Sequence, residues 1–186
     1  MNINDIVILG LLAEMPRHGY EIKKEVEERG LNDWASVKIQ SIYNRLKVLE
    51  KEGYISLDTV KKQGNMPEKS IYKIEASGYL YLHNQIIEAL GIQGHRTYHD
   101  SFVAMGFMIP VLSDEIVKAI ENLYNHFQSK YGTVENKHAA PELPLNWKIL
   151  IECGAGHINV ARKTVGEILQ AIKDGRIIMG DKKRCI

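Results

Sequence analysis

The sequence predicts a mainly α-helical protein with one small β-hairpin, and three features of the chain predict this class. Apolar residues recur at three- and four-residue steps, the spacing of one helix face, over most of the chain. Between residues 54 and 74 they instead alternate with polar residues on both sides of a turn-forming stretch, the pattern of two paired strands. Glycines and prolines separate these segments, at Gly30, Gly53 and Pro110 among others.

The composition is that of a globular protein with one domain or two small ones. The chain has 186 residues, 45% of them hydrophobic and 25% charged, which is enough to bury a normal core. No run approaches the roughly 18 apolar residues that a membrane-spanning helix needs, and the first residues have no basic segment of a secretory signal. Cys153 and Cys185 are far apart, so we predict no disulfide framework and expect a cytoplasmic protein without contact with membranes.

Three helices and a hairpin are predicted in the first 75 or so residues. The first helix covers residues 3–15, and the second follows a short turn and ends at Gly30. A link over residues 31–35 leads to the third helix, which we expect to begin at Ser36 and to end at Gly53. Two strands follow, joined by a turn. This order of elements is that of a winged helix-turn-helix, whose last helix lies in the major groove of DNA.

The third helix and the hairpin carry most of the excess positive charge. Residues 36–73 contain eight Lys or Arg and four Asp or Glu, whereas the whole chain has a net charge of +1. A near-neutral protein with one basic region does not coat nucleic acid indiscriminately, but it can bind a specific site. Along the third helix, Ile39, Ile42, Leu46 and Leu49 are expected to face the core.

The polar face of this helix gives the candidate DNA contacts. Long donors and amides can pair with base edges in the major groove, so we assign direct readout to Lys38, Gln40, Ser41 and Asn44. Other cationic or hydroxyl side chains are expected to reach phosphate: Tyr43 and Lys47 on the helix, Lys61, Lys62 and Lys69 on the hairpin, and Arg17 and Tyr20 where the second helix begins and its free N–H groups favour an anion.

The second half of the chain is predicted to be entirely helical. A helix follows the hairpin, and three further helical segments cover residues 98–109, 113–131 and 145–174, the last one softly interrupted by Gly-Ala-Gly. We place the winged helix-turn-helix domain at residues 1–78 and a helical dimerisation domain at residues 79–186. The two long helices have apolar stripes that we expect to be buried. The first stripe consists of Ile116, Ile120, Leu123, Phe127 and Tyr131, and the second of Ile149 or Leu150, Cys153, His157, Val160 or Ala161, Thr164, Ile168 and Ile172. These helices are too few to enclose a core alone, so a second copy of the chain is the simplest partner.

Three motifs in the first half resemble the PadR family of bacterial and archaeal transcriptional regulators. They are HGYEI at 18–22, SIYNRLKVLEKEGYI at 41–55 and KSIYKIEASG at 69–78. The segment at 143–169 is similar to the longer-tailed branch of that family. The resemblance implies a homodimeric repressor that binds double-stranded operator DNA and releases it when a small molecule binds, with dimerisation through the C-terminal helices. It implies no enzymatic activity and no cofactor.

The effector site is a weaker prediction. Aromatic and sulfur-containing side chains could line an apolar pocket, although such residues at helical spacing are more often ordinary core. The candidates are Tyr98, Phe102, Met105, Phe107 and Trp147.

Two other classes of function are kept as alternatives. Cys153 and His157 are four residues apart, as are His95 and His99, which is a ligand spacing on a helix and would suit a metal- or redox-responsive DNA-binding sensor. No third ligand is in register, so we predict no metal site and prefer ordinary packing for the pair. The first domain could also be an adaptor for another protein, since fold does not fix function. No nucleophile–base pair or phosphate loop indicates catalysis.

Overall fold

The computed structural model describes residues 2–35, 37–60, 70–91, 98–138 and 144–178. Contacts within the chain divide it into two units. Unit 1 includes the chain up to Leu90 and the segment that ends at Ser113, and unit 2 covers Asp114–Ile178. In the described residues, none of the helices combines the length and the apolar character that crossing a membrane would require.

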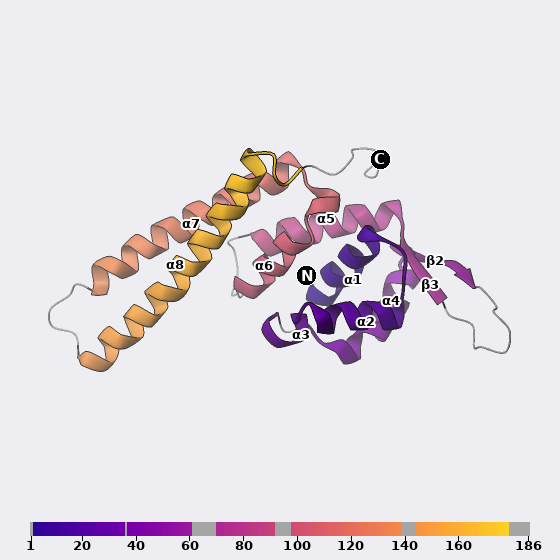
Figure 1. The fold of residues 1–186 in the computed structure, drawn as a ribbon, viewed down its shortest axis with the longest axis horizontal. Helices are drawn as coiled ribbons and strands as arrows, with labels where there is room; N and C mark the ends of the chain where they lie inside the picture. Colours follow the sequence, from indigo (N-terminus) through magenta and orange to yellow (C-terminus); the bar gives the residue numbers. More distant parts are fainter. Residues whose placement is uncertain (1, 36, 61–69, 92–97, 139–143, 179–186) are drawn as a thin grey trace. The chain divides into compact units, whose positions relative to one another are not determined.

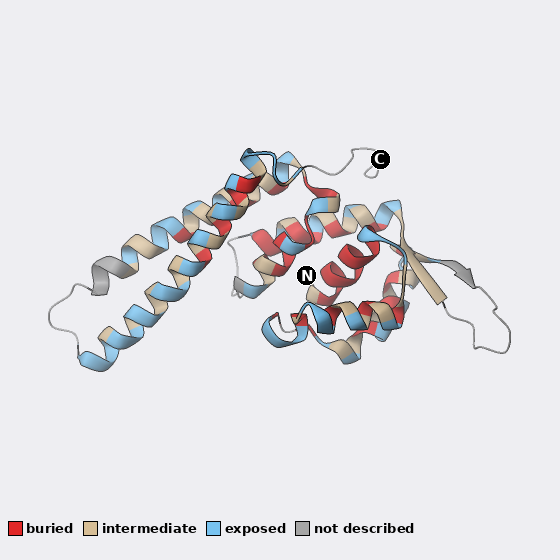
Figure 2. Ribbon diagram, viewed as in Figure 1, coloured by how far each residue is buried: buried red, intermediate tan, exposed pale blue. Residues whose placement is uncertain are grey.

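Unit 1 is built around one buried helix, α1, as the colours of Figure 2 show along its length. Ten consecutive residues of α1, from Asn4 to Ala13, are buried. The elements of unit 1 are shown in Figure 1, in chain order: α1 Ile3–Glu14, β1 Arg17–His18, α2 Gly19–Glu28, α3 Leu31–Trp34, the 3-10 turn η1 Ile39–Ser41, α4 Ile42–Lys51, β2 Ile55–Val60, β3 Ser70–Ile74, α5 Ala76–Leu90, α6 Tyr98–Gly106 and the 3-10 turn η2 Ile109–Val111.

The predicted third helix is α4, and it begins later than the sequence suggested. Ser36, the expected N-cap, lies outside the described residues, and Lys38 to Ser41 form an extended residue followed by a 3-10 turn. Ile42, Leu46 and Leu49 are buried as predicted, whereas Ile39 is only half-buried. Gly53 has a φ of 75°, the left-handed conformation that ends the helix.

The small sheet has three strands rather than the predicted two. The hairpin strands β2 and β3 are antiparallel, with Ile55 opposite Ile74, and β1 adds to the other edge of β3, with Arg17 opposite Tyr72. We expected only a turn at β1. A strand of two residues has no alternation to recognise, and its partner lies more than 50 residues away in the sequence.

Helices α5 and α6 pack in unit 1, so this compact unit extends beyond residue 78. α5 places Leu82, Ile86 and Ala89 in the core that α1 begins, and the Ser101 hydroxyl of α6 donates to the Ala89 carbonyl at 2.9 Å. We keep residues 1–78 as the proposed DNA-binding part of this larger unit.

Unit 2 is a pair of long helices, α7 Asp114–His138 and α8 Leu145–Lys173. The apolar stripe of α7 is as predicted, with Ile116, Ile120, Leu123 and Phe127 buried. α8 continues without a break through the Gly-Ala-Gly sequence.

The stripe of α8 that faces α7 differs from the predicted one. Ala161, Val165 and Leu169 are buried, whereas Thr164 and Ile168, which we expected to be buried, are half-exposed. At Gly166 a Cβ would meet the Tyr124 ring at 3.0 Å. The two helices approach closely at small residues, and this selects a face displaced by one residue from the predicted one.

Candidate nucleic-acid interface

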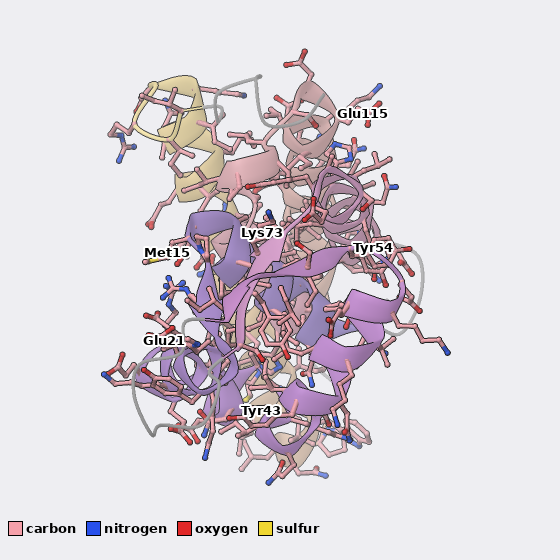
Figure 3. The ribbon with its side chains drawn as sticks, turned by 90° about the vertical axis from the view of Figure 1, so that its right-hand side faces the viewer. Met15, Glu21, Tyr43, Tyr54, Lys73 and Glu115 are labelled. Carbon is pink, nitrogen blue, oxygen red and sulfur yellow. The ribbon has the colours of Figure 1, made fainter. Side chains whose placement is uncertain are left out.

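One polar face of η1 and α4 is exposed beside the sheet. Because Ile42, Leu46 and Leu49 are buried, the other side of α4 is turned to solvent. Most of the side chains that we assigned to DNA readout lie there: Lys38, Gln40, Asn44 and Lys47 are exposed, Tyr43 has 51% of its surface exposed, and Ser41 is half-buried. Tyr43 is labelled in Figure 3.

Asn4 of α1 holds the segment that leads into this face. Its side-chain amide donates to the Lys38 carbonyl at 3.2 Å, and its side-chain oxygen accepts from the Lys38 N–H at 3.3 Å. Asn4 is 5% exposed. Both backbone groups of Lys38 are therefore satisfied by one buried side chain, which fixes where the Lys38 side chain leaves the surface.

Asp5, the next residue of α1, holds α4 itself. Its carboxylate is fully buried and accepts two hydrogen bonds of 2.7 Å from Nε and Nη2 of Arg45. The Tyr81 hydroxyl of α5 donates a third, at 3.1 Å. This two-pronged geometry is the strongest common arrangement for an arginine and a carboxylate. The Arg45 guanidinium is therefore bound to Asp5, although Arg45 lies next to Asn44.

The electrostatics of this cluster follow from its burial. The hydrogen bond to Asp5 raises the pKa of the Arg45 guanidinium, which remains charged. Burial, together with the Asp5 charge, raises the pKa of the Tyr81 hydroxyl to about 12. The Tyr81 ring stacks on Tyr54, with ring centroids 4.3 Å apart. Three helices and the start of the hairpin thus meet around one carboxylate.

The first turn of α2 packs against the exposed face of α4. A Cβ at Gly19 would lie 2.9 Å from the Tyr43 ring, so the glycine permits the contact. Tyr20 is 50% exposed and stacks on His18 at 5.6 Å between ring centroids. Tyr20 therefore remains a candidate for phosphate contact.

Arg17 has a different setting from the one we expected. Its side chain is 12% exposed, and its guanidinium donates to Glu14, to Glu25 and to the Leu11 carbonyl. At the N-terminus of α2, where we expected a phosphate, the Glu21 carboxylate accepts from the His18 N–H at 2.7 Å. These carboxylates compete with phosphate, so the structure gives Arg17 a bracing role between α1 and α2.

Lys61, Lys62 and Lys69, the predicted contacts on the hairpin, lie outside the described residues. The base of the hairpin is tied to α5. The Glu75 N–H donates to the Tyr54 carbonyl at 3.0 Å, the Ser77 hydroxyl donates to the Gly53 carbonyl at 2.6 Å, and the Ser56 hydroxyl donates to the Glu75 carboxylate. Most of these partners come from the motifs at 41–55 and 69–78.

The five candidate effector residues have different surroundings. Met105 and Phe107 are buried in unit 1, where Phe107 lies against Gly10 and under the Arg29 guanidinium. Phe102 is half-buried, and the side chain of Tyr98 is not described. Trp147 belongs to unit 2 and is 55% exposed. Met105 and Phe107 serve as core, and the pocket remains a prediction.

Cys153 and His157 are both exposed on α8. Over the described ranges, no group of three or more His, Cys, Asp or Glu side chains is placed to hold a metal ion. His95 lies outside these ranges. Within the described residues of one chain, Cys153 and His157 therefore have no third metal ligand beside them.

Sequence reasoning missed the residues that position the face. Asn4 and Asp5 lie in the first predicted helix, where periodicity indicates ordinary scaffold, and Arg45 lies between donors that we assigned to the exposed face. The available signal was the pair of polar residues inside a long apolar run, because a buried carboxylate requires a partner.

Residues 8–84 match the family model described as the transcriptional regulator PadR-like family. A comparison with curated proteins gave no match.

Solved structures that resemble the chain include Bacillus subtilis PadR in complex with operator DNA, with 23% identity, a TM-score of 0.44 and coverage of 92% of this chain and 99% of that one. The same protein in complex with p-coumaric acid has 22% identity, a TM-score of 0.42 and the same coverage. For smu.1604c from Streptococcus mutans, the identity is 25%, the TM-score 0.42 and the coverage 91% and 99%. Residues 8–84, less than half of the chain, are thus similar to the PadR-like family of transcriptional regulators, whose members bind DNA.

Proposed function

We propose that this protein is a homodimeric repressor that reads an operator with the exposed face of η1 and α4 and releases it when a small molecule binds. One observation carries the DNA-reading part of this proposal. Lys38, Gln40, Asn44 and Lys47 are exposed together, on elements that Asn4 and Asp5 fix from the core. An acceptor-rich major groove requires such a set of donors at fixed positions.

The division of labour follows from side-chain chemistry. Gln40 and Asn44 carry amides that can donate to and accept from one adenine, and Lys38 can donate to guanine. Lys47 and Tyr43 reach phosphate, which sets the position of the protein without reading sequence. The lysines of the hairpin, Lys61, Lys62 and Lys69, are proposed to contact the backbone or the adjacent minor groove.

Dimerisation is proposed through the N-terminal part of α8. Large apolar side chains are exposed along its N-terminal half, where Figure 2 shows few buried residues: Leu145, Trp147, Ile149, Leu150 and Val160, each at least 55% exposed. A soluble monomer rarely exposes so many large apolar side chains on one helix, and the same helix of a second copy would cover them. Two copies would present two reading helices to two half-sites.

Repression and effector release are the finer parts of the proposal. A regulator that only occupies its operator blocks transcription, and a ligand can remove it only by binding the free form more tightly. A thermal-shift panel of aromatic acids, antibiotics and cationic dyes tests for a ligand. p-Coumaric acid, present in one of the similar structures, belongs in it. Because it acts on the chromosome, we place the protein in the cytoplasm.

The test of DNA reading uses duplexes that the pure protein selects from a random library, with binding followed by fluorescence anisotropy. The double variant Lys38→Ala/Asn44→Ala should lose at least about tenfold in affinity for the selected duplex, since each good base contact contributes about 1–3 kcal/mol. Its melting temperature should not change, because both side chains are exposed.

Lys24→Ala is the matched control for the loss of Lys38. Lys24 is exposed on α2, outside the proposed reading face, and pairs only with Glu28 among the described ion pairs. Affinity of the double variant equal to that of this control would remove α4 from the reading role. If neither wild-type nor variant protein binds any duplex at low salt, the adaptor interpretation replaces the proposal.

The dimer is tested separately, by sedimentation equilibrium. Leu150→Asp should yield a monomer, because a carboxylate would be buried without a partner in the interface. Ile178→Asp, at a position that is 72% exposed beyond the end of α8, should leave the dimer intact. A wild-type protein that is monomeric at high micromolar concentration would contradict the proposed assembly.

A further inference from the structure

The ion pair between Asp5 and Arg45 joins α1 to α4 beside the proposed DNA-reading face. Arg45 lies one residue after Asn44, and it lines a hollow of about 280 Å³ together with Lys38, Ser41 and residues 2–4 of α1. Its side chain is therefore next to the proposed DNA-reading face and is 25% exposed. A free arginine at this point would be well placed to contact phosphate or guanine.

Building on the proposed function, we propose that Asp5 is a specificity-determining positioning residue. It fixes the rotation of α4 and at the same time keeps the Arg45 guanidinium from DNA.

The geometry supports both roles. Two hydrogen bonds of 2.7 Å define the plane of the guanidinium relative to α1, and Asp5 has no exposed surface. The Tyr81 hydroxyl donates a further hydrogen bond to Oδ2 of Asp5, the atom that also accepts from Nη2 of Arg45, so the carboxylate cannot turn freely. Apolar contacts alone, as at Ile42 and Leu46, do not define a rotation this sharply.

The substitution Asp5→Asn separates this inference from a purely structural role. The amide retains the size of the side chain but has one oxygen and one NH₂ group, so it cannot accept the two N–H groups of Arg45 on two separate oxygens. The partly exposed Arg45 side chain then turns to solvent beside the reading face. We expect weaker binding to the selected duplex, stronger binding to unrelated duplexes, and a non-specific salt slope steeper by about 0.9 for each added phosphate contact.

The measured quantity is the ratio of the dissociation constants for an unrelated duplex and for the selected one, at a temperature where every variant is folded by circular dichroism. For Asp5→Asn this ratio should fall at least tenfold. The double variant Asp5→Asn/Arg45→Gln removes the released cation, so its non-specific affinity should return to the wild-type level while its ratio remains low.

Glu28→Gln is the matched control, because it also removes one negative charge and releases a cation, Lys24, from an exposed ion pair on α2. Its ratio should equal that of the wild type. If Asp5→Asn does not fold, Tyr81→Phe takes its place. It removes only the third hydrogen bond to the carboxylate, and its ratio should fall two- to threefold.

A folded Asp5→Asn protein with the ratio and salt slope of Glu28→Gln would overturn the inference, as would a loss of affinity for both duplexes in equal proportion. Wild-type protein that binds no duplex would instead overturn the proposed function, and this inference with it.

Discussion

Gly78, at the start of α5, is the position where one added methyl group should cost the most. Its Cβ would lie 2.2 Å from the Tyr54 carbonyl oxygen and 2.8 Å from Cγ1 of Ile74, whereas ordinary contact begins at 3.4 Å. The near atom belongs to the backbone, so no side-chain rotation relieves the contact. In Gly78→Ala the start of α5 must therefore move away from Tyr54 by about 1 Å.

The free-energy cost has two parts. Overpacking of this kind costs about 1–3 kcal/mol. The movement also weakens the hydrogen bond from the Glu75 N–H to the Tyr54 carbonyl, 3.0 Å long, worth about 1 kcal/mol. The higher helix propensity of alanine recovers less than about 1 kcal/mol. A net loss of about 1–3 kcal/mol follows, which for a chain of this size lowers the melting temperature by about 2–12 °C.

Differential scanning calorimetry measures this loss, with Gly132→Ala as the matched control. Gly132 lies inside α7, and a Cβ there meets no atom within 4 Å. The same substitution should therefore stabilise the protein there, by about 0.5–1 kcal/mol. Equal melting temperatures for Gly78→Ala and wild type would refute the close packing of α5 against the hairpin.

Three further predictions follow from described contacts. Asn4→Ala removes both hydrogen bonds to the Lys38 backbone and should cost about 1–2 kcal/mol in urea unfolding; a loss below about 0.5 kcal/mol would contradict the bracing role. Because burial and Asp5 raise the pKa of Tyr81 to about 12, the folded state retains a proton that the unfolded state loses near pH 10. Stability should therefore fall as the pH rises from 10 towards 12, by less in Tyr81→Phe, and parallel urea curves for the two proteins would contradict this. Val165→Ala, at a fully buried site on α8, should cost about 2 kcal/mol at every protein concentration, whereas Val160→Ala, at a 62% exposed site, should act only where dimers form.

The sequence alone was sufficient to predict α4 and the hairpin, for a physical reason. Ile42, Leu46 and Leu49 follow the helical period, and Gly53 supplies the left-handed residue at the end, so the signals are local. The start of α4 was less predictable, because the conformation of Lys38 depends on Asn4, 34 residues earlier. Strand β1 depends in the same way on a distant partner, Tyr72.

The register of α8 illustrates a second limit. Val160 and Ala161, and Thr164 and Val165, are adjacent pairs in which either member could face inwards. Hydrophobicity favours no single face there. The structure buries Ala161 and Val165, where small residues let α7 approach, and leaves Val160 outside. Which face of α8 is buried therefore depends on α7, and the periodicity of the α8 sequence holds no information about α7.

Asn4 and Asp5, the two buried polar residues of α1, have a role that two apolar residues could not have. Replacing a buried ion pair by packed apolar residues is often neutral or stabilising, so stability alone does not explain Asn4 and Asp5. Adjacent residues on a helix point about 100° apart, so one reaches Lys38 and the other reaches Arg45, at the two ends of the segment that begins the reading face. Two directional anchors seven residues apart define both the position and the rotation of that segment. A regulator that must place an amide within hydrogen-bonding distance of a base edge requires this precision, and contacts between apolar residues, which have no direction, do not supply it.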